Sequence, residues 1–88
     1  MHRKHVIITL DGIEHKVPKF TIGEHEAVAD IFQGPAKSIA AGVLGLALSI
    51  AVPPVQDVKS LRVGFKEIQA AVAAVLKFND YQDADPNA

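Results

Sequence analysis

The sequence predicts an α+β fold: an N-terminal β-hairpin, then about three α-helices, and a disordered acidic C-terminal tail. Two short apolar runs flank an Asp-Gly pair near the N-terminus, which is a strong hairpin signal. Beyond Pro18, apolar residues recur at three- and four-residue spacing, as they do in helices. From residue 79 the chain is polar and acidic, so we expect a single domain over residues 1–78 and a disordered tail over 79–88.

The turn sets the register of the hairpin. We take Asp11 and Gly12 as the two central residues of a type I′ turn, which pairs the flanking residues outward from it. The pairs expected on the apolar, core-facing side are Leu10 with Ile13, Ile8 with His15, and Val6 with Val17. The pairs expected on the opposite side are Thr9 with Glu14 and Ile7 with Lys16. The second strand should end at Pro18, because proline has no N–H to donate to a strand ladder.

A first helix is predicted to begin at Ile22. Thr21 and Glu24 have the spacing of a capping box, in which each side chain bonds the backbone of the other residue. The residues expected on its apolar face are Ala27, Val28, Ile31 and Phe32, with Glu26 and Asp30 on the opposite face. Gly34 and Pro35 should end this helix, and Pro35 suits the first position of the next one.

The stretch from Ser38 to Pro54 carries no charge and is apolar around its whole circumference, which is typical of a helix buried on every side. It is shorter than the ~20 apolar residues of a membrane span. A chain of 88 residues has only a hairpin and two other helices to cover it. We therefore expect the surplus surface, at Val43, Leu46 and Ile50, to be buried against another chain.

The third predicted helix follows the stretch from Val55 to Val63, whose form the pattern does not define. Its apolar face comprises Phe65, Ile68, Val72, Val75 and Leu76. Ala70, Ala73 and Ala74 form a flat patch of small side chains on another side, where another helix could approach closely. This patch could serve the domain's own core or a neighbouring chain. We expect Ala74 to lie at the edge of the domain's own core.

The side chains do not form a pattern typical of catalysis or of metal or cofactor binding. The chain has no Cys, and its four His are spread over the terminus, both faces of the hairpin and the first helix. A zinc site needs three or four converging ligands. We expect no catalytic residue, no metal, no cofactor and no enzymatic activity. His15 is interpreted as a residue at the rim of the core that packs on Ile8, with one ring nitrogen reaching water.

Charge and N-terminal composition bear on partners and location. A net charge of -1 gives no basic footprint for nucleic acid. The apolar run after the basic N-terminus is too short for a signal peptide. The absence of Cys suits a reducing compartment. We expect a cytoplasmic protein that binds neither nucleic acid nor membranes.

The order of these segments resembles the tail assembly chaperones of long-tailed bacteriophages. The similarity lies in the strand and turn of residues 8–12, the Val17-Pro18 pair, the Thr-apolar-Gly helix start at 21–23, and the Ala- and Val-rich helix of residues 67–76. It extends over roughly residues 6–78. The resemblance implies a non-catalytic late protein that self-associates and coats the tape measure protein in the host cytoplasm. Other tail proteins are further partners that the resemblance suggests.

Two alternatives come from other classes. One is a structural virion subunit of the tail or connector, in which the hairpin adds a strand to a neighbouring sheet. The other is a small membrane-associated protein anchored by residues 39–52.

Overall fold

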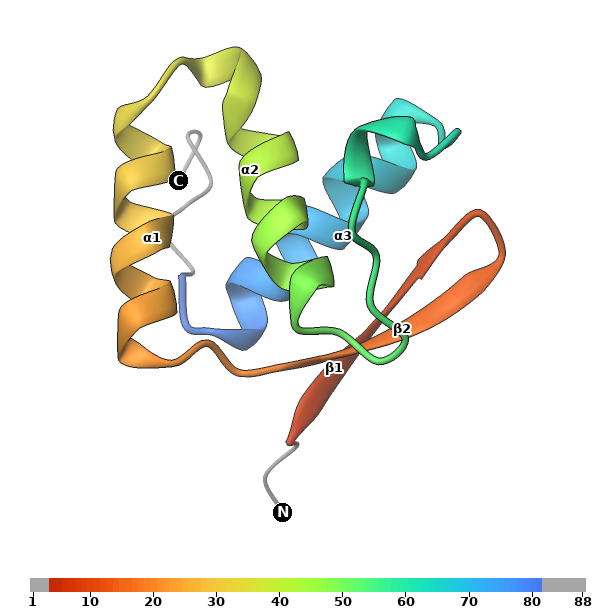
Figure 1. The fold of residues 1–88 in the computed structure, drawn as a ribbon, viewed down its shortest axis with the longest axis horizontal. Coiled ribbons are helices and arrows are strands. Elements are labelled where there is room, and N and C mark those ends of the chain that lie inside the picture. Colours follow the sequence, from red (N-terminus) through yellow and green to blue (C-terminus); the bar gives the residue numbers. More distant parts are fainter. Residues whose placement is uncertain (1–3, 82–88) are drawn as a thin grey trace.

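A computed structural model of the chain describes residues 4–81 and confirms the predicted fold class. Figure 1 shows a two-stranded antiparallel hairpin followed by three α-helices. The elements are β1 (His5–Leu10), β2 (Ile13–Pro18), α1 (Ile22–Gln33), α2 (Ala36–Ser49), a 3₁₀ turn η1 (Val58–Ser60) and α3 (Phe65–Phe78). The predicted tail lies outside the described residues from 82 onward.

The hairpin has the predicted turn and register. Asp11 and Gly12 have φ angles of 53° and 77°, as a type I′ turn requires. Ile8 pairs with His15, and the strand pairing extends from Leu10 opposite Ile13 to His5 opposite Pro18. The expectation that Ile13 faces the core is wrong, because 53% of its surface is exposed. Figure 1 shows the turn end of the hairpin projecting to one side of the helices.

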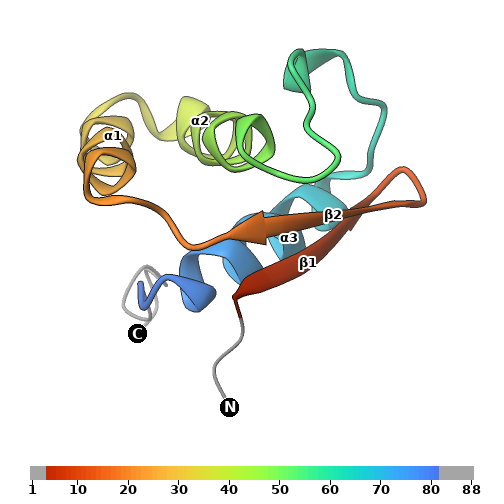
Figure 2. The ribbon, with the colours of Figure 1, turned by 60° about the horizontal axis from the view of Figure 1, so that its bottom comes forward.

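The domain has two layers. Figure 2 shows α1 and α2 side by side in one layer, with the hairpin and α3 in the other. α3 packs along β1, and both of its ends are tied to the hairpin. Glu67 Oε2 accepts from the Asp11 N–H at 2.8 Å, and Lys19 Nζ donates to the Phe78 carbonyl at 2.8 Å.

The segment after α2 extends the sheet by one bridge. The Lys16 N–H donates to the Val52 carbonyl, and the Val52 N–H donates to the Lys16 carbonyl, both at 2.9 Å. These bonds place Val52 beside the outer edge of β2. The same segment supplies the partner of His15, whose side chain is buried and whose Nδ1 lies 2.7 Å from the Pro53 carbonyl oxygen. A carbonyl only accepts, so Nδ1 carries a proton and donates it to Pro53. The partner of this nitrogen is therefore a backbone carbonyl of the protein.

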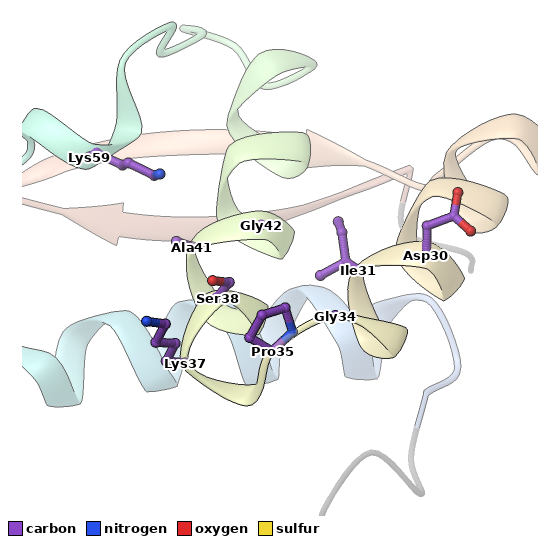
Figure 3. A pocket seen from close by; sticks show the side chains of 9 residues that line it. All are labelled: Asp30, Ile31, Gly34, Pro35, Lys37, Ser38, Ala41, Gly42 and Lys59. Carbon is purple, nitrogen blue, oxygen red and sulfur yellow. The ribbon is translucent and has the colours of Figure 1, made fainter.

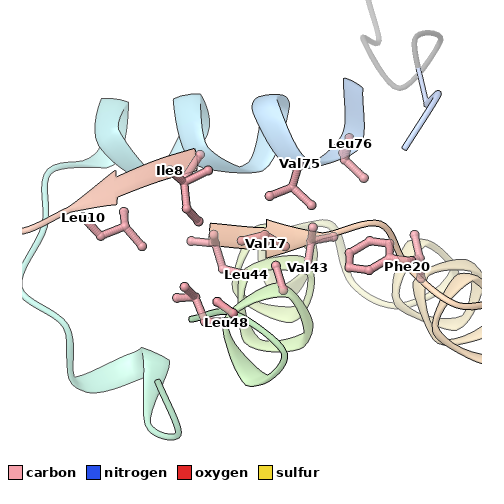
Figure 4. Packing of buried hydrophobic residues seen from close by; sticks show 13 residues of the cluster. Ile8, Leu10, Val17, Phe20, Val43, Leu44, Leu48, Val75 and Leu76 are labelled. Carbon is pink, nitrogen blue, oxygen red and sulfur yellow. The ribbon is translucent and has the colours of Figure 1, made fainter. Parts of the chain in front are cut away.

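One apolar core joins the hairpin to all three helices. Figure 4 shows Ile8 and Val17 of the hairpin between Val75 of α3 and Leu44 of α2. The buried apolar residues are Ile8, Leu10, Val17, Phe20, Val28, Val43, Leu44, Ala47, Leu48, Ala51, Ala71, Val75 and Leu76. The capping box of α1 is present, with Thr21 and Glu24 bonding each other's backbone N–H at 3.1 and 2.8 Å.

The expectation that α2 is buried on every side is wrong for the single chain. The helix ends at Ser49, its N-cap is Pro35, and its buried residues are Val43, Leu44, Ala47 and Leu48. The opposite side carries Ser38, Gly45 and Ser49, which are exposed or half-buried. Small side chains expose little apolar surface to water, so this side can stay open without a large energetic cost.

The predicted domain boundary at residue 78 lies too early. Asn79 is buried: its Oδ1 accepts from the Phe20 N–H at 2.8 Å, and its Nδ2 donates to the Val75 carbonyl at 2.9 Å. The half-buried Tyr81 has its hydroxyl 2.7 Å from His25 Nδ1. Residues 79 to 81 therefore belong to the folded domain, because their side chains close the gap between α1 and the C-terminal end of α3.

Candidate functional site

The open side of α2 forms the floor of a surface groove between α1 and η1. In Figure 3, Ser38, Ala41 and Gly42 of α2 lie between Ile31 of α1 and Lys59 of η1. The hollow has a volume of about 500 Å³. Gly34 and Pro35, which connect α1 to α2, line one end. A low floor between two higher walls is a shape that suits an elongated partner such as a helix.

A second hollow of about 240 Å³ continues the first one towards α3. The two hollows share Lys37, Ala41 and Lys59. The side chains that line the second hollow are mostly apolar: Leu10, Ala40, Leu44, Val58, Leu61, Val63, Phe65 and Ile68. We call the two hollows together the α2 groove.

Close packing of α1 against α2 depends on Gly42. A Cβ atom at this position would lie 2.9 Å from Cγ2 of Ile31, well inside van der Waals contact. Gly45, on the same open side of the helix, has no atom within 4 Å of the equivalent position. Gly42 is therefore explained by the domain's own packing, whereas the space above Gly45 is free for another molecule.

The rim of the α2 groove is more basic than acidic. Lys37 and Lys59 are exposed and line both hollows, and Asp30 is exposed on the α1 side. Figure 3 shows Asp30 and Lys59 on opposite sides of α2. An apolar segment flanked by acidic residues would match this combination of apolar lining and basic rim.

The six residues predicted to bind protein differ in how far the structure buries them. Val43 is fully buried in the core of the chain and has no surface left for a partner, so this prediction is wrong. Leu46 and Ile50 are half-buried and pack against the core. Ala70 and Ala73 are exposed, on the side of α3 that faces away from the core.

Ala74 lies deeper than expected. It is half-buried and packs against the core, so a charged residue there would disturb the fold as well as any interface. Ala73 is exposed and is the better position at which to test a contact on α3.

Sequence reasoning missed the groove residues themselves. The apolar spacing of Val58, Leu61 and Val63 was a usable signal, because a solvated loop has no need of three large apolar residues at close intervals. Lys37 and Lys59 carried no signal, since a single exposed lysine is ordinary. Their common position on one rim exists only after α2 and η1 have packed together.

Within residues 4–81, no three His, Cys, Asp or Glu side chains converge closely enough to hold a metal ion. No helix in this part of the chain has the length and apolar character needed to cross a membrane. His25 lies among aromatic rings, with the Phe20 ring edge-on at 5.7 Å and the Tyr81 ring at 5.6 Å between centroids. This cluster joins α1 to the C-terminal turn and is explained by packing.

Comparisons of the chain with protein-family models, with curated proteins and with solved structures find no match.

Proposed function

We propose that this chain is a non-catalytic protein-binding domain that holds an amphipathic helix of its partner in the α2 groove. The observation that carries the proposal is the groove itself: a floor of small residues between walls that carry larger apolar side chains. A floor residue such as Ala41 lets a second helix approach α2 closely, and Leu61 and Phe65 offer apolar contacts at its side.

The chemistry of the groove indicates what kind of helix it takes. A helix laid on α2 contacts it with residues at positions i, i+3, i+4 and i+7, so these must be apolar. Lys37 and Lys59 stand at the rim and favour acidic residues beside that stripe. Long amphipathic helices with such a stripe are prone to aggregate until a partner covers them.

The specific role that we propose is that of a tail assembly chaperone of a long-tailed bacteriophage. In this role, several copies of the chain coat the tape measure protein in the host cytoplasm and keep it soluble. The proposal is supported by the resemblance of residues 6–78 to that family and by the groove. Exposed apolar side chains outside the groove, such as Ile22 and Val52, add surface for contacts between copies.

Co-expression of the full chain with a tape measure fragment tests the proposal. The wild-type chain should raise the soluble fraction of the fragment and co-purify with it. Ala41→Glu should abolish capture, because the carboxylate fills the groove and is desolvated when a helix covers it. The new side chain lies four residues after Lys37, an arrangement that a helix tolerates well.

Ala73→Glu is the matched control. It also introduces a carboxylate on a helix four residues from a lysine, here Lys77, but on the exposed side of α3. Capture should be unchanged. If only Ala73→Glu prevents capture, the partner helix binds α3 and not the α2 groove. If the wild-type chain captures nothing, the chaperone role is refuted.

A permanent structural subunit is the second candidate, and the outer edge of β1, which has no backbone partner within residues 4–81, favours it. Mass spectrometry of finished particles separates the two roles. A chaperone is absent from them, whereas a structural subunit is present at a fixed copy number.

A further inference from the structure

The outer edge of β1 has free backbone hydrogen-bonding groups. The N–H and C=O of Lys16 both bond to Val52, so they point away from β1. Along an antiparallel pair, every second residue has its backbone N–H and C=O pointing away from the partner strand. The residue directly opposite it on the partner strand also has its backbone N–H and C=O pointing outward. Ile7 is the residue opposite Lys16, so the outward groups of β1 belong to His5, Ile7 and Thr9. Within residues 4–81, none of them has a backbone partner.

Solvent can reach this edge. Ile7 is 49% exposed and Thr9 is exposed, while α3 packs on β1 through the core-facing side. Two of the devices that commonly protect an edge strand are absent from β1, which contains neither a proline nor a bulge. An exposed β-branched residue at the centre of an unpaired edge strand is a site for strand addition.

The charges along β1 indicate the direction of the added strand. Lys4 precedes the strand, and Asp11 follows it with Glu67 bonded to its N–H. The strand therefore has a basic start and an acidic end. A parallel copy would place like charges together, whereas an antiparallel copy places Lys4 of each chain near Asp11 of the other.

We propose that two copies of this chain pair through β1, antiparallel, with the two Ile7 residues facing each other on the dyad. His5 of each copy then lies opposite Thr9 of the other, and all three outward residues take part in about six new hydrogen bonds. The two hairpins become one four-stranded sheet, and a closed dimer forms. The proposal rests on the proposed function only in expecting self-association, and it assigns one surface through which two copies associate.

A pair of matched substitutions tests the interface by analytical ultracentrifugation of the full chain. Ile7→Lys should weaken dimerisation at least about tenfold, because two lysines would meet at the dyad. Ile13→Lys is the control: Ile13 is equally exposed, at 53%, but lies on β2 beside the turn. Circular dichroism should show both variants folded, since both side chains already face solvent. An unchanged dimer in Ile7→Lys, or equal loss in both variants, would overturn the proposal.

Single cysteines test the register without depending on affinity, because the natural chain has no Cys. Directly opposed residues of an antiparallel pair have Cα atoms ~5.5 Å apart, within the range that a disulfide spans. Ile7→Cys should therefore form a covalent dimer on mild oxidation, and Ile13→Cys should not. Efficient cross-linking of Ile13→Cys alone would refute the register.

The outcomes separate this inference from the proposed function. Ile7→Lys leaves the α2 groove intact, so a monomeric variant should still bind a tape measure fragment. A chain that dimerises through β1 and captures no helix would refute only the proposed function. A chain that captures helices and dimerises through another face would refute only the β1 interface.

Discussion

Asn79 is predicted to be one of the most sensitive polar residues of the domain. Its side chain is 7% exposed and makes two hydrogen bonds, to the Phe20 N–H at 2.8 Å and to the Val75 carbonyl at 2.9 Å. The first bond joins residues 59 positions apart and holds the start of α1 against the end of α3. Replacing Asn79 with alanine removes both bonds at once.

The size of the effect follows from those two bonds. Each contributes about 1 kcal/mol net, and leaving the Phe20 N–H buried without a partner costs about 1–3 kcal/mol. Asn79→Ala should therefore lower the free energy of unfolding by about 2–4 kcal/mol. A domain of this size has a total stability of about 5 kcal/mol, so the variant should be close to unfolding at room temperature.

Urea unfolding followed by circular dichroism measures this change. Asp80→Asn is the control: Asp80 is exposed and has a φ of 70°, a conformation that asparagine tolerates well. Its stability should change by less than about 0.5 kcal/mol. A loss below about 0.5 kcal/mol in Asn79→Ala, with an unchanged denaturant slope, would refute the view that residues 79 to 81 belong to the folded domain.

Two local predictions follow from the helices. Thr21→Ala removes the hydrogen bond to the Glu24 N–H and should lower the free energy of unfolding in urea by about 1 kcal/mol. Thr21→Ser should be nearly neutral, and an equal loss of stability in both variants would contradict the role of Thr21 as a cap. Gly42→Ala should cost about 1–3 kcal/mol because its methyl group meets Ile31, while Gly45→Ala should be neutral or stabilise by up to about 1 kcal/mol. Thermal unfolding of the two glycine variants checks this, and the reverse order of stability would show that α1 and α2 pack differently.

Features that depend on neighbouring residues were predictable. The hairpin register follows from Asp11 and Gly12, since both residues tolerate the positive φ that a type I′ turn needs at its two central positions. The start of α1 follows from two residues three positions apart, Thr21 and Glu24. In both places the interacting groups are close in the chain, so their types and spacing are enough to specify the geometry.

The candidate site was predicted only in part. The open surface of α2 was expected from its uncharged sequence, but the side that stays open was not. In a helix without charged residues, the sequence pattern does not distinguish the buried face from the exposed face. Val43 was therefore assigned to a partner although it is fully buried, and Ala41 was overlooked although it lines both hollows.

The sequence by itself determined the order of the elements and the pairing of the two strands. Only the tertiary structure decided which apolar side chains stay exposed, because burial depends on which elements cover one another. Asp11 meets Glu67 and Phe20 meets Asn79 across more than 50 residues, and no spacing rule connects such positions. The α2 groove and the free edge of β1 have the same origin. Each is the surface that remains after α1, η1 and α3 have packed, and packing is a property of the whole chain.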